Sequence, residues 1–224
     1  MKQNNSNILN EEIKIKKALI SVTDKNDVDK LAIELVKQGI EIISTGGTAN
    51  LLREKLIPVK DVSEETLFPE ILNGRVKTLH PKIHGGILNR RNNANHQQEI
   101  EKYNISEIDL IIINLYKFKE TVAKTNSEFD IIENIDIGGP AMIRAGAKNY
   151  EFVTVITDPN DYPELIKQIQ KNKSTTYDFR KTLARKAFKL TSDYDKAIAD
   201  WFKKDDEEVY DLPKKLSINL EKSL

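Results

Sequence analysis

Residues 40–55, IEIISTGGTANLLREK, carry the order of elements that indicates the fold. Ile40–Ser44 is a short, β-rich apolar run, and Ala49–Lys55 is predicted to be a helix. Thr45-Gly46-Gly47-Thr48 joins the two. A strand that turns directly into a helix is a building unit of α/β domains, so this stretch predicts one such unit.

The same alternation continues on both sides of this stretch. Ile111, Ile112 and Ile113 form a continuous apolar run, as expected of a central strand covered on both faces. The other predicted elements are the strands Ala18–Val22, Asp109–Leu115 and Phe152–Ile156, and the helices Asp27–Gln38, Ala141–Asn149 and one that begins at Asp158-Pro159. The alternation predicts an α/β domain with a mainly parallel sheet.

A long helix is predicted over Tyr177–Phe202. Its apolar residues recur at steps of three or four, so they form a stripe that must be buried on the sheet or against another subunit: Phe179, Leu183, Ala187, Leu190, Tyr194, Ile198 and Trp201. The charged stretch after this helix contains a proline and indicates a linker, and Leu216–Leu220 then alternates like a strand.

Composition limits the class of protein. The 224 residues carry 35 Lys and Arg and 35 Asp and Glu, so a nucleic acid is not expected as the main partner. The chain has no cysteine, which excludes disulfides and Cys-ligated metals. No apolar run approaches the ~20 residues that span a bilayer, and the polar N-terminus lacks a signal-peptide pattern. A cytoplasmic protein without a membrane partner is therefore predicted.

Two loops are candidates for binding a phosphate. The glycines of Thr45-Gly46-Gly47-Thr48 let the backbone approach an anion, to which hydroxyls and helix N-terminal amides donate hydrogen bonds. Ser21-Val22-Thr23-Asp24-Lys25 also ends a strand, so both loops can open on the edge where α/β sheets bind ligands. The alternative is an ordinary turn in which Thr48 is the helix N-cap.

A basic segment, GRVKTLHP, lies at residues 74–81. If this segment is extended, Arg75 and Lys77 point the same way, which suits an anionic group. The alternative is an exposed basic loop.

His80 and His84 have the spacing of two metal ligands on a helix. Pro81 and the Gly85-Gly86 pair argue against a helix there, and no third ligand is evident. A metal site is therefore not predicted.

Two further segments stand where active-site groups can lie. Asp136-Ile137-Gly138-Gly139-Pro140 leads into a predicted helix, and Asn114-Leu115-Tyr116 ends the apolar strand. Tyr116 can also simply cap the core with its hydroxyl in water. Lys148 lies about two helical turns beyond the start of its helix, so spacing alone does not bring it near Asp136. Gly146 costs about 1 kcal/mol relative to Ala in a helix, which indicates close packing or a tolerated weakness.

The chain resembles one family in five segments that occur in the same order: SVTDK, STGGT, GRVKTLHPKIHGGIL, INLYKF and IDIGGPAMIRAGAKN. They are similar to the N-terminal domain of the bifunctional purine biosynthesis proteins, which join IMP cyclohydrolase to AICAR transformylase. The resemblance runs from about Lys17 to Phe202. It implies a methylglyoxal-synthase-like fold, a three-layer sandwich with a mainly parallel central sheet, to which the long C-terminal helix is added.

The resemblance also implies the site. Lys77, Tyr116, Asp136 and Lys148 are expected to be catalytic, with Lys148 paired with Asp136. Asn114, Tyr116, Asp136 and Gly138 would surround the base, and several other residues would hold the 5′-phosphate. The residues expected to bind the nucleotide are Ser21, Thr23, Lys25, Thr45, Gly46, Gly47, Thr48, Arg75, Thr78, Asn114 and Gly138. No cofactor and no metal are expected, and the family implies a homodimer.

The implied substrate is 5-formamidoimidazole-4-carboxamide ribotide, which is formylated AICAR. Its carboxamide nitrogen attacks the formyl carbon, and the carbinolamine loses water to give IMP. The site then needs a proton acceptor and a group that stabilises the oxyanion. Asp136 is expected to accept the amide proton with Lys148 tuning its charge, while Lys77 and Tyr116 stabilise the oxygen.

The chain departs from the family in a few places. Gly146 replaces a common Ala, and Lys117 stands where a Pro is common. Residues 1–16 are interpreted as a polar extension, 17–202 as the cyclohydrolase domain, and 203–224 as a linker that leads to a missing transformylase domain. A truncated chain without formyl transfer is therefore expected.

Three alternatives remain open. A lyase of the methylglyoxal synthase type shares the fold and a phosphate site but acts on a triose phosphate. A regulatory domain that senses nucleotides would have no need for the four acid–base residues. An inactive fragment would bind the nucleotide weakly or aggregate.

Overall fold

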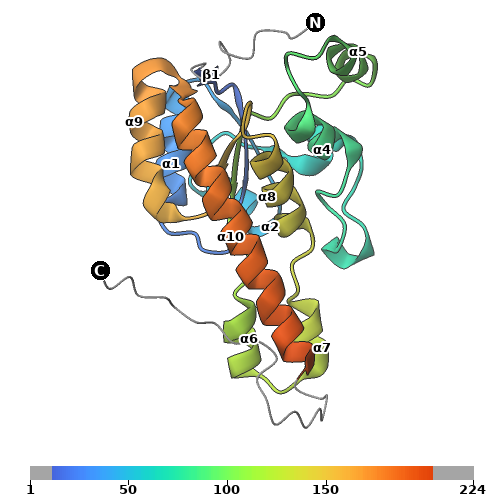
Figure 1. The fold of residues 1–224 in the computed structure, drawn as a ribbon. Helices are drawn as coiled ribbons and strands as arrows, with labels where there is room; N and C mark the ends of the chain where they lie inside the picture. The colour runs from blue at the N-terminus through green and yellow to red at the C-terminus, as the bar shows by residue number, and fades with distance from the viewer. Residues whose placement is uncertain (1–11, 204–224) are drawn as a thin grey trace, which may run out of the picture.

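The computed structural model describes residues 12–203 (Figure 1). The predicted linker, the predicted strand at Leu216–Leu220 and most of the predicted N-terminal extension lie outside these residues. Among the described residues, no helix combines the length and the apolar character needed to cross a bilayer.

A central sheet of five strands has the order β4-β3-β2-β5-β6, and each neighbouring pair is parallel. The predicted parallel sheet is therefore confirmed. Three of its four longer strands fall within the predicted apolar runs, and β2 begins one residue before its predicted run. The strands are β2 Lys17–Ser21, β3 Glu41–Ser44, β4 Lys60–Asp61, β5 Leu110–Ile113 and β6 Thr154–Ile156.

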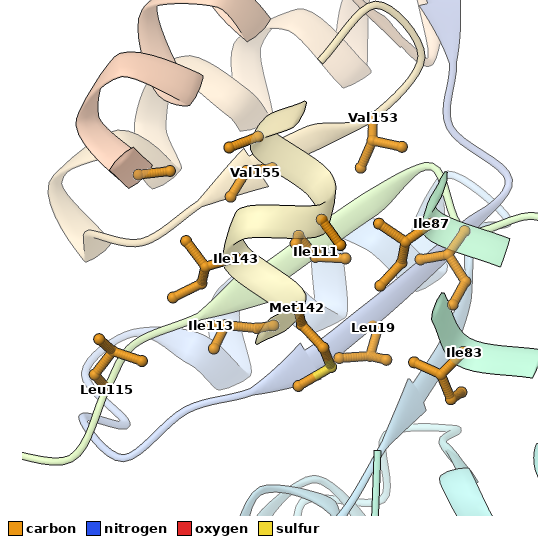
Figure 2. Close-up of a cluster of buried hydrophobic side chains, with 14 of the residues drawn as sticks. Leu19, Ile83, Ile87, Ile111, Ile113, Leu115, Met142, Ile143, Val153 and Val155 are labelled. Carbon is orange, nitrogen blue, oxygen red and sulfur yellow. The ribbon is translucent and has the colours of Figure 1, made fainter. Parts of the chain in front are cut away.

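Helices cover both faces of the sheet, because successive side chains of a strand point to opposite faces. Leu19 and Ile111 belong to one buried cluster, and Ile20 and Ile112 belong to the other. Figure 2 shows the first cluster, which lies between the sheet and the helices α4 and α8. Its helices are α3 Val62–Thr66, α4 Pro81–Leu88, α8 Gly138–Lys148 and α10 Tyr177–Phe202, whereas α1 Val28–Lys37, α2 Gly46–Glu54 and α9 Tyr162–Asn172 line the other face.

Gly146 lies where helix α8 packs most closely on the sheet. A Cβ at this position would stand 2.6 Å from methyl groups of both Ile111 and Val155. The absence of a side chain therefore serves close packing, which is the first of the two readings drawn from the sequence.

Helix α10 has the predicted bounds, Tyr177–Phe202. Figure 1 shows it crossing the molecule beside α8. Leu183, Ala187 and Tyr194 of the predicted stripe are buried in the domain's own two clusters. The stripe therefore packs within the chain, so its burial requires no other subunit.

The end of the predicted N-terminal extension takes part in the fold. β1 (Ile13–Lys14) pairs antiparallel with β7 (Ser174–Thr175), and the next residue, Ile15, is buried. Residues 13–15, which the sequence assigned to the extension, thus pack on the domain.

The expectation that Pro81 and the Gly85-Gly86 pair exclude a helix at His80 and His84 is wrong, because Pro81–Leu88 forms α4. Pro81 occupies the first turn, where a missing N–H is harmless, and the Nδ1 atom of His80 caps the helix by accepting the N–H of Lys82 at 3.1 Å. A Cβ on Gly86 would collide with the carbonyl oxygen of Ser106. The glycine pair therefore reflects close packing of the helix.

The remaining helices are absent from the predictions because they have little apolar periodicity. α5 buries no residue, and α6 and α7 each bury one, Phe118 and Ile131 respectively. Their bounds are α5 Ala94–Lys102, α6 Phe118–Lys124 and α7 Glu128–Glu133, and two short 3-10 turns are η2 Leu72–Gly74 and η3 Pro159–Asp161.

Candidate functional site

The candidate site lies at the carboxyl ends of β2, β3 and β5. These strands are parallel neighbours, so their exits meet at one edge of the sheet, where open α/β sheets bind ligands. Ser21 is the last residue of β2, and Thr23 and Lys25 are exposed in the loop that follows.

Two predicted ligand residues hold this loop in place through hydrogen bonds to its backbone. The side-chain oxygen of Asn114 accepts the N–H groups of Thr23 at 2.6 Å and Asp24 at 3.0 Å, and its amide donates to the Asp24 carbonyl. The buried hydroxyl of Thr48 bonds to both the N–H and the carbonyl of Val22 at 3.0 Å. Both side chains fix the conformation of the loop.

Helix α2 begins three residues before its predicted start. Its N-cap is Thr45, in extended conformation, so Thr48 is not the cap. Gly46 has a φ of 55°, which favours glycine, and the first N–H groups of a helix lack intrahelical partners. The Nζ atoms of Lys77 and Lys25 lie 3.5 and 3.7 Å from the positions that Cβ atoms on Gly46 and Gly47 would occupy. Two cations therefore lie beside a helix N-terminus, an arrangement that suits a phosphate.

Glu70 was not singled out from the sequence, although it contacts two predicted residues. One carboxylate oxygen accepts the Thr45 hydroxyl at 2.7 Å, and the other pairs with the Nζ atom of Lys77 at 3.1 Å. The carboxylate thus holds the buried hydroxyl and the lysine close to each other.

The segment of Arg75 and Lys77 is not extended, so the condition under which the two side chains would point the same way is not met. Arg75 has helical angles, φ −65° and ψ −26°, because the chain turns back on itself and Ile71 bridges to Val76. Arg75 forms an ion pair with Glu133, whereas Lys77 reaches Glu70 and Gly46. Arg75 therefore ties its segment to α7.

The acidic part of the site is the turn before α8. The Oδ1 atom of Asp136 accepts the Gly139 N–H at 2.8 Å, and the backbone N–H of Tyr116 donates to the same carboxyl group. Burial raises the pKa of Asp136, although these two hydrogen bonds act in the opposite direction. Tyr116 is 47% exposed, which fits both interpretations of the sequence, a residue at the rim of a site and a cap on the core with its hydroxyl in water.

A close contact joins the basic and acidic parts. The Oγ1 atom of buried Thr78 lies 2.8 Å from the position that a Cβ on Gly138 would take. Because Thr78 directly follows Lys77, and Gly138 lies two residues after Asp136, this contact brings the cation segment and the carboxyl segment together.

The predicted pairing of Lys148 with Asp136 is not formed within the chain. Lys148 is exposed at the last residue of α8, while Asp136 precedes its first residue. Eleven helical residues rise roughly 15 Å, which exceeds the reach of a lysine side chain. The other predicted site residues lie at the end of β2 and in the loop after it, at the start of α2, in residues 75–78, after the exit of β5, and at the start of α8.

The site as a whole offers cations and a helix N-terminus at one end and a half-buried carboxyl group beside an exposed tyrosine at the other. This set can hold a phosphorylated ligand and exchange a proton with it.

Comparison with known proteins identifies relatives of the chain. Residues 27–141 match the family model described as an MGS-like domain, and residues 146–224 match one described as the AICARFT/IMPCHase bienzyme. The crystal structure of ForH is 33% identical, with a TM-score of 0.74, and the match covers 84% of this chain and 99% of that chain. These matches confirm the methylglyoxal-synthase-like fold.

Longer relatives carry the name bifunctional purine biosynthesis protein PurH. The one from Agrobacterium fabrum is 50% identical over 193 residues, which cover 86% of this chain and 36% of that protein. The one from Persephonella marina is 52% identical over 184 residues, covering 82% and 36%. The one from Oceanobacillus iheyensis is 50% identical over 208 residues, covering 92% and 40%. The chain thus spans two fifths or less of the length of these relatives.

Proposed function

Because the chain belongs to the family of MGS-like domains, we propose that it binds a purine ribotide at this site and has IMP cyclohydrolase activity. The substrate is formylated AICAR and the product is IMP. The longer PurH relatives support this proposal, since they are about half identical to the chain over most of its length.

The single observation that carries the proposal is the contact of Thr78 with Gly138. It brings Lys77, beside the N-terminus of α2, to the same edge as Asp136. A ribotide has a phosphate at one end, for which the N-terminus of α2 and Lys25 are the proposed ligands, and a reacting base at the other, for which Lys77 and Asp136 are the proposed groups.

The proposed reaction is intramolecular. The carboxamide nitrogen bonds to the formyl carbon and loses a proton, and the carbinolamine then loses water to give IMP. Both reacting groups are on one ring, so the protein mainly selects the productive rotamers and excludes water.

Asp136 is the proposed acceptor of the amide proton. Its raised pKa makes it a stronger base than an ordinary aspartate, and the N–H groups of Gly139 and Tyr116 orient the carboxyl. Lys77 and the hydroxyl of Tyr116 are the proposed stabilisers of the formyl oxygen as it gains charge. No metal or redox cofactor takes part in this scheme.

We also propose a cytoplasmic homodimer in which residues 17–202 act as the cyclohydrolase domain. The exposed apolar side chains around the site support an interface between copies: Phe68, Leu72, Phe129 and Ile137 are 47%, 66%, 72% and 60% exposed. Since Lys148 does not reach Asp136 in its own chain, we propose that it acts at the site of the second copy.

Calorimetric titration with IMP tests the phosphate site. Lys25→Ala is expected to weaken IMP binding about tenfold or more, because a charge-assisted hydrogen bond contributes roughly 1.5–3 kcal/mol. Lys124→Ala on exposed α6 is the matched control and should bind normally. Equal affinity of the wild type and Lys25→Ala would contradict the phosphate assignment. Turnover of a triose phosphate would favour a lyase, and IMP binding without ring closure would favour a sensing domain.

A further inference from the structure

The hydroxyl group of Tyr194 contacts the segment that carries Asp136. Tyr194 is a stripe residue of α10 and is 8% exposed, so its sequence position predicts only a core side chain. The Asp136 N–H donates to the Tyr194 hydroxyl at 2.8 Å, and that hydroxyl donates to the Asn134 carbonyl at 3.5 Å. One hydroxyl thus bridges the backbone between α7 and α8.

The ring of Tyr194 belongs to an aromatic cluster that also fixes the segment of Tyr116. The Phe118 ring lies edge-on to Tyr194, with centroids 6.3 Å apart, and edge-on to Trp201 at 6.1 Å. Phe118 is buried, and its N–H donates to the Tyr116 carbonyl at 2.9 Å. Helix α10 therefore holds the two segments that meet at the Asp136 carboxyl.

Packing of the Tyr194 ring in the aromatic cluster does not require its hydroxyl group. Phenylalanine has the same ring and would make the same edge-on contacts with Phe118. The hydroxyl adds two hydrogen bonds to the backbone on either side of Ile135, which sets where Asp136 begins its turn. The turn then aligns the Asp136 carboxyl with the N–H groups of Gly139 and Tyr116.

We propose that Tyr194 is a positioning residue for the ring-closure reaction, which it supports by fixing the backbone of Asp136 through its hydroxyl. The inference rests on the proposed function of the site. It gives the C-terminal half of α10 a role in orienting the Asp136 carboxyl, the proposed proton acceptor.

Tyr194→Phe tests the proposal in the full chain. We expect kcat to fall about tenfold or more with KM changed less than about twofold, because small displacements of a catalytic group reduce turnover strongly while leaving phosphate contacts intact. Tyr177→Phe is the matched control, since it removes a hydroxyl at the first residue of the same helix, where Tyr177 bonds to the hydroxyl of Tyr150. Equal kcat for wild type and Tyr194→Phe would overturn the proposal.

A second measurement tests the proposal without an activity assay. The pKa of Asp136 can be followed by ¹³C NMR in chain labelled at aspartate. The titratable groups near it include Tyr116 after β5, whose N–H bonds to its carboxyl, and Tyr194 on α10. Loosening the turn weakens the two N–H bonds that lower this pKa, so Tyr194→Phe should raise it and Tyr177→Phe should not. An unchanged Asp136 pKa in Tyr194→Phe refutes the role of Tyr194. Absence of turnover in the wild type would refute only the proposed activity.

Discussion

The carboxyl group of Asp136 lies in the space beside Gly139 that any other residue would fill with its Cβ. Oδ1 accepts the Gly139 N–H at 2.8 Å, and the carboxyl carbon lies 2.9 Å from the position of that Cβ. The Leu115 side chain closes the other side of this position, also at 2.9 Å. The carboxyl is therefore held between a helix N-terminus and the exit of β5.

Gly139→Ala is expected to abolish this arrangement. The added methyl group must displace Asp136 or Leu115, so we expect turnover to fall by about 100-fold, with a loss of roughly 1–3 kcal/mol in the free energy of unfolding. Steady-state kinetics and urea unfolding measure the two effects. Gly85→Ala is the control, because its Cβ meets only the end of the flexible Ile105 side chain, at 3.1 Å. Normal turnover in Gly139→Ala would disprove this role of the contact.

The pH dependence of turnover should report Asp136. Burial raises its pKa above the ordinary 3.8, and the N–H groups of Gly139 and Tyr116 oppose the shift. The Asp136 carboxyl must be ionised to accept a proton, so kcat/KM should fall as the pH drops through this raised pKa. A pH profile of the wild type should show this acid limb above pH 3.8, and Asp136→Asn should lack it. A limb that persists in Asp136→Asn would assign it to another group.

Predictions from the sequence succeeded where one local signal dominates. The central strands are apolar on both faces, and the stripe of α10 repeats over many turns, so both were predicted with nearly the observed bounds. The turn from β3 into α2 was also predicted, because a glycine pair after a strand is a local pattern, whereas phosphate binding there stays a prediction.

The contacts that complete the site depend on residues far apart in the chain. Glu133 and Arg75 are 58 positions apart, and so are Tyr194 and Asp136. Neither Glu133 nor Tyr194 stands in a sequence pattern that marks it as functional. Helix α4 was missed because the glycine pair weakens local helix propensity, while the packing of Gly86 against Ser106 favours the helix.

Mixed dimers test whether Lys148 acts on the second copy. Asp136→Asn and Lys148→Ala are each expected to lose most turnover as homodimers. After subunit exchange, half of the dimers are mixed and one of their two sites is intact, so about a quarter of wild-type turnover should return. No recovery, despite mixed dimers seen by native mass spectrometry, would show that Lys148 does not act across the interface.

Glu65 should stabilise the fold in a pH-dependent way. Burial opposes its ionisation, but hydrogen bonds from Lys60, Ser106 and Lys17 outweigh burial and lower its pKa from 4.5 to about 2. Because the folded-state pKa is depressed, this stability is present above pH 4.5 and is lost as the pH falls toward 2.

Glu65→Gln measures this contribution. We expect it to lower the free energy of unfolding by about 2 kcal/mol at neutral pH, as for a lost charge-assisted hydrogen bond, and the difference should shrink in acid. Glu120→Gln removes an exposed partner of Lys117 and Lys124 and should cost less than about 0.5 kcal/mol. A Glu65→Gln effect that stays constant down to pH 2 would argue against the depressed pKa.

The most direct measurement is a spectrophotometric assay of the purified chain with formylated AICAR in the absence of any folate. The account predicts that IMP forms in amounts equal to the substrate consumed, and that Asp136→Asn loses about 100-fold or more of this turnover while it still binds IMP. No IMP formation by a folded wild-type chain that binds IMP would contradict the proposed ring closure.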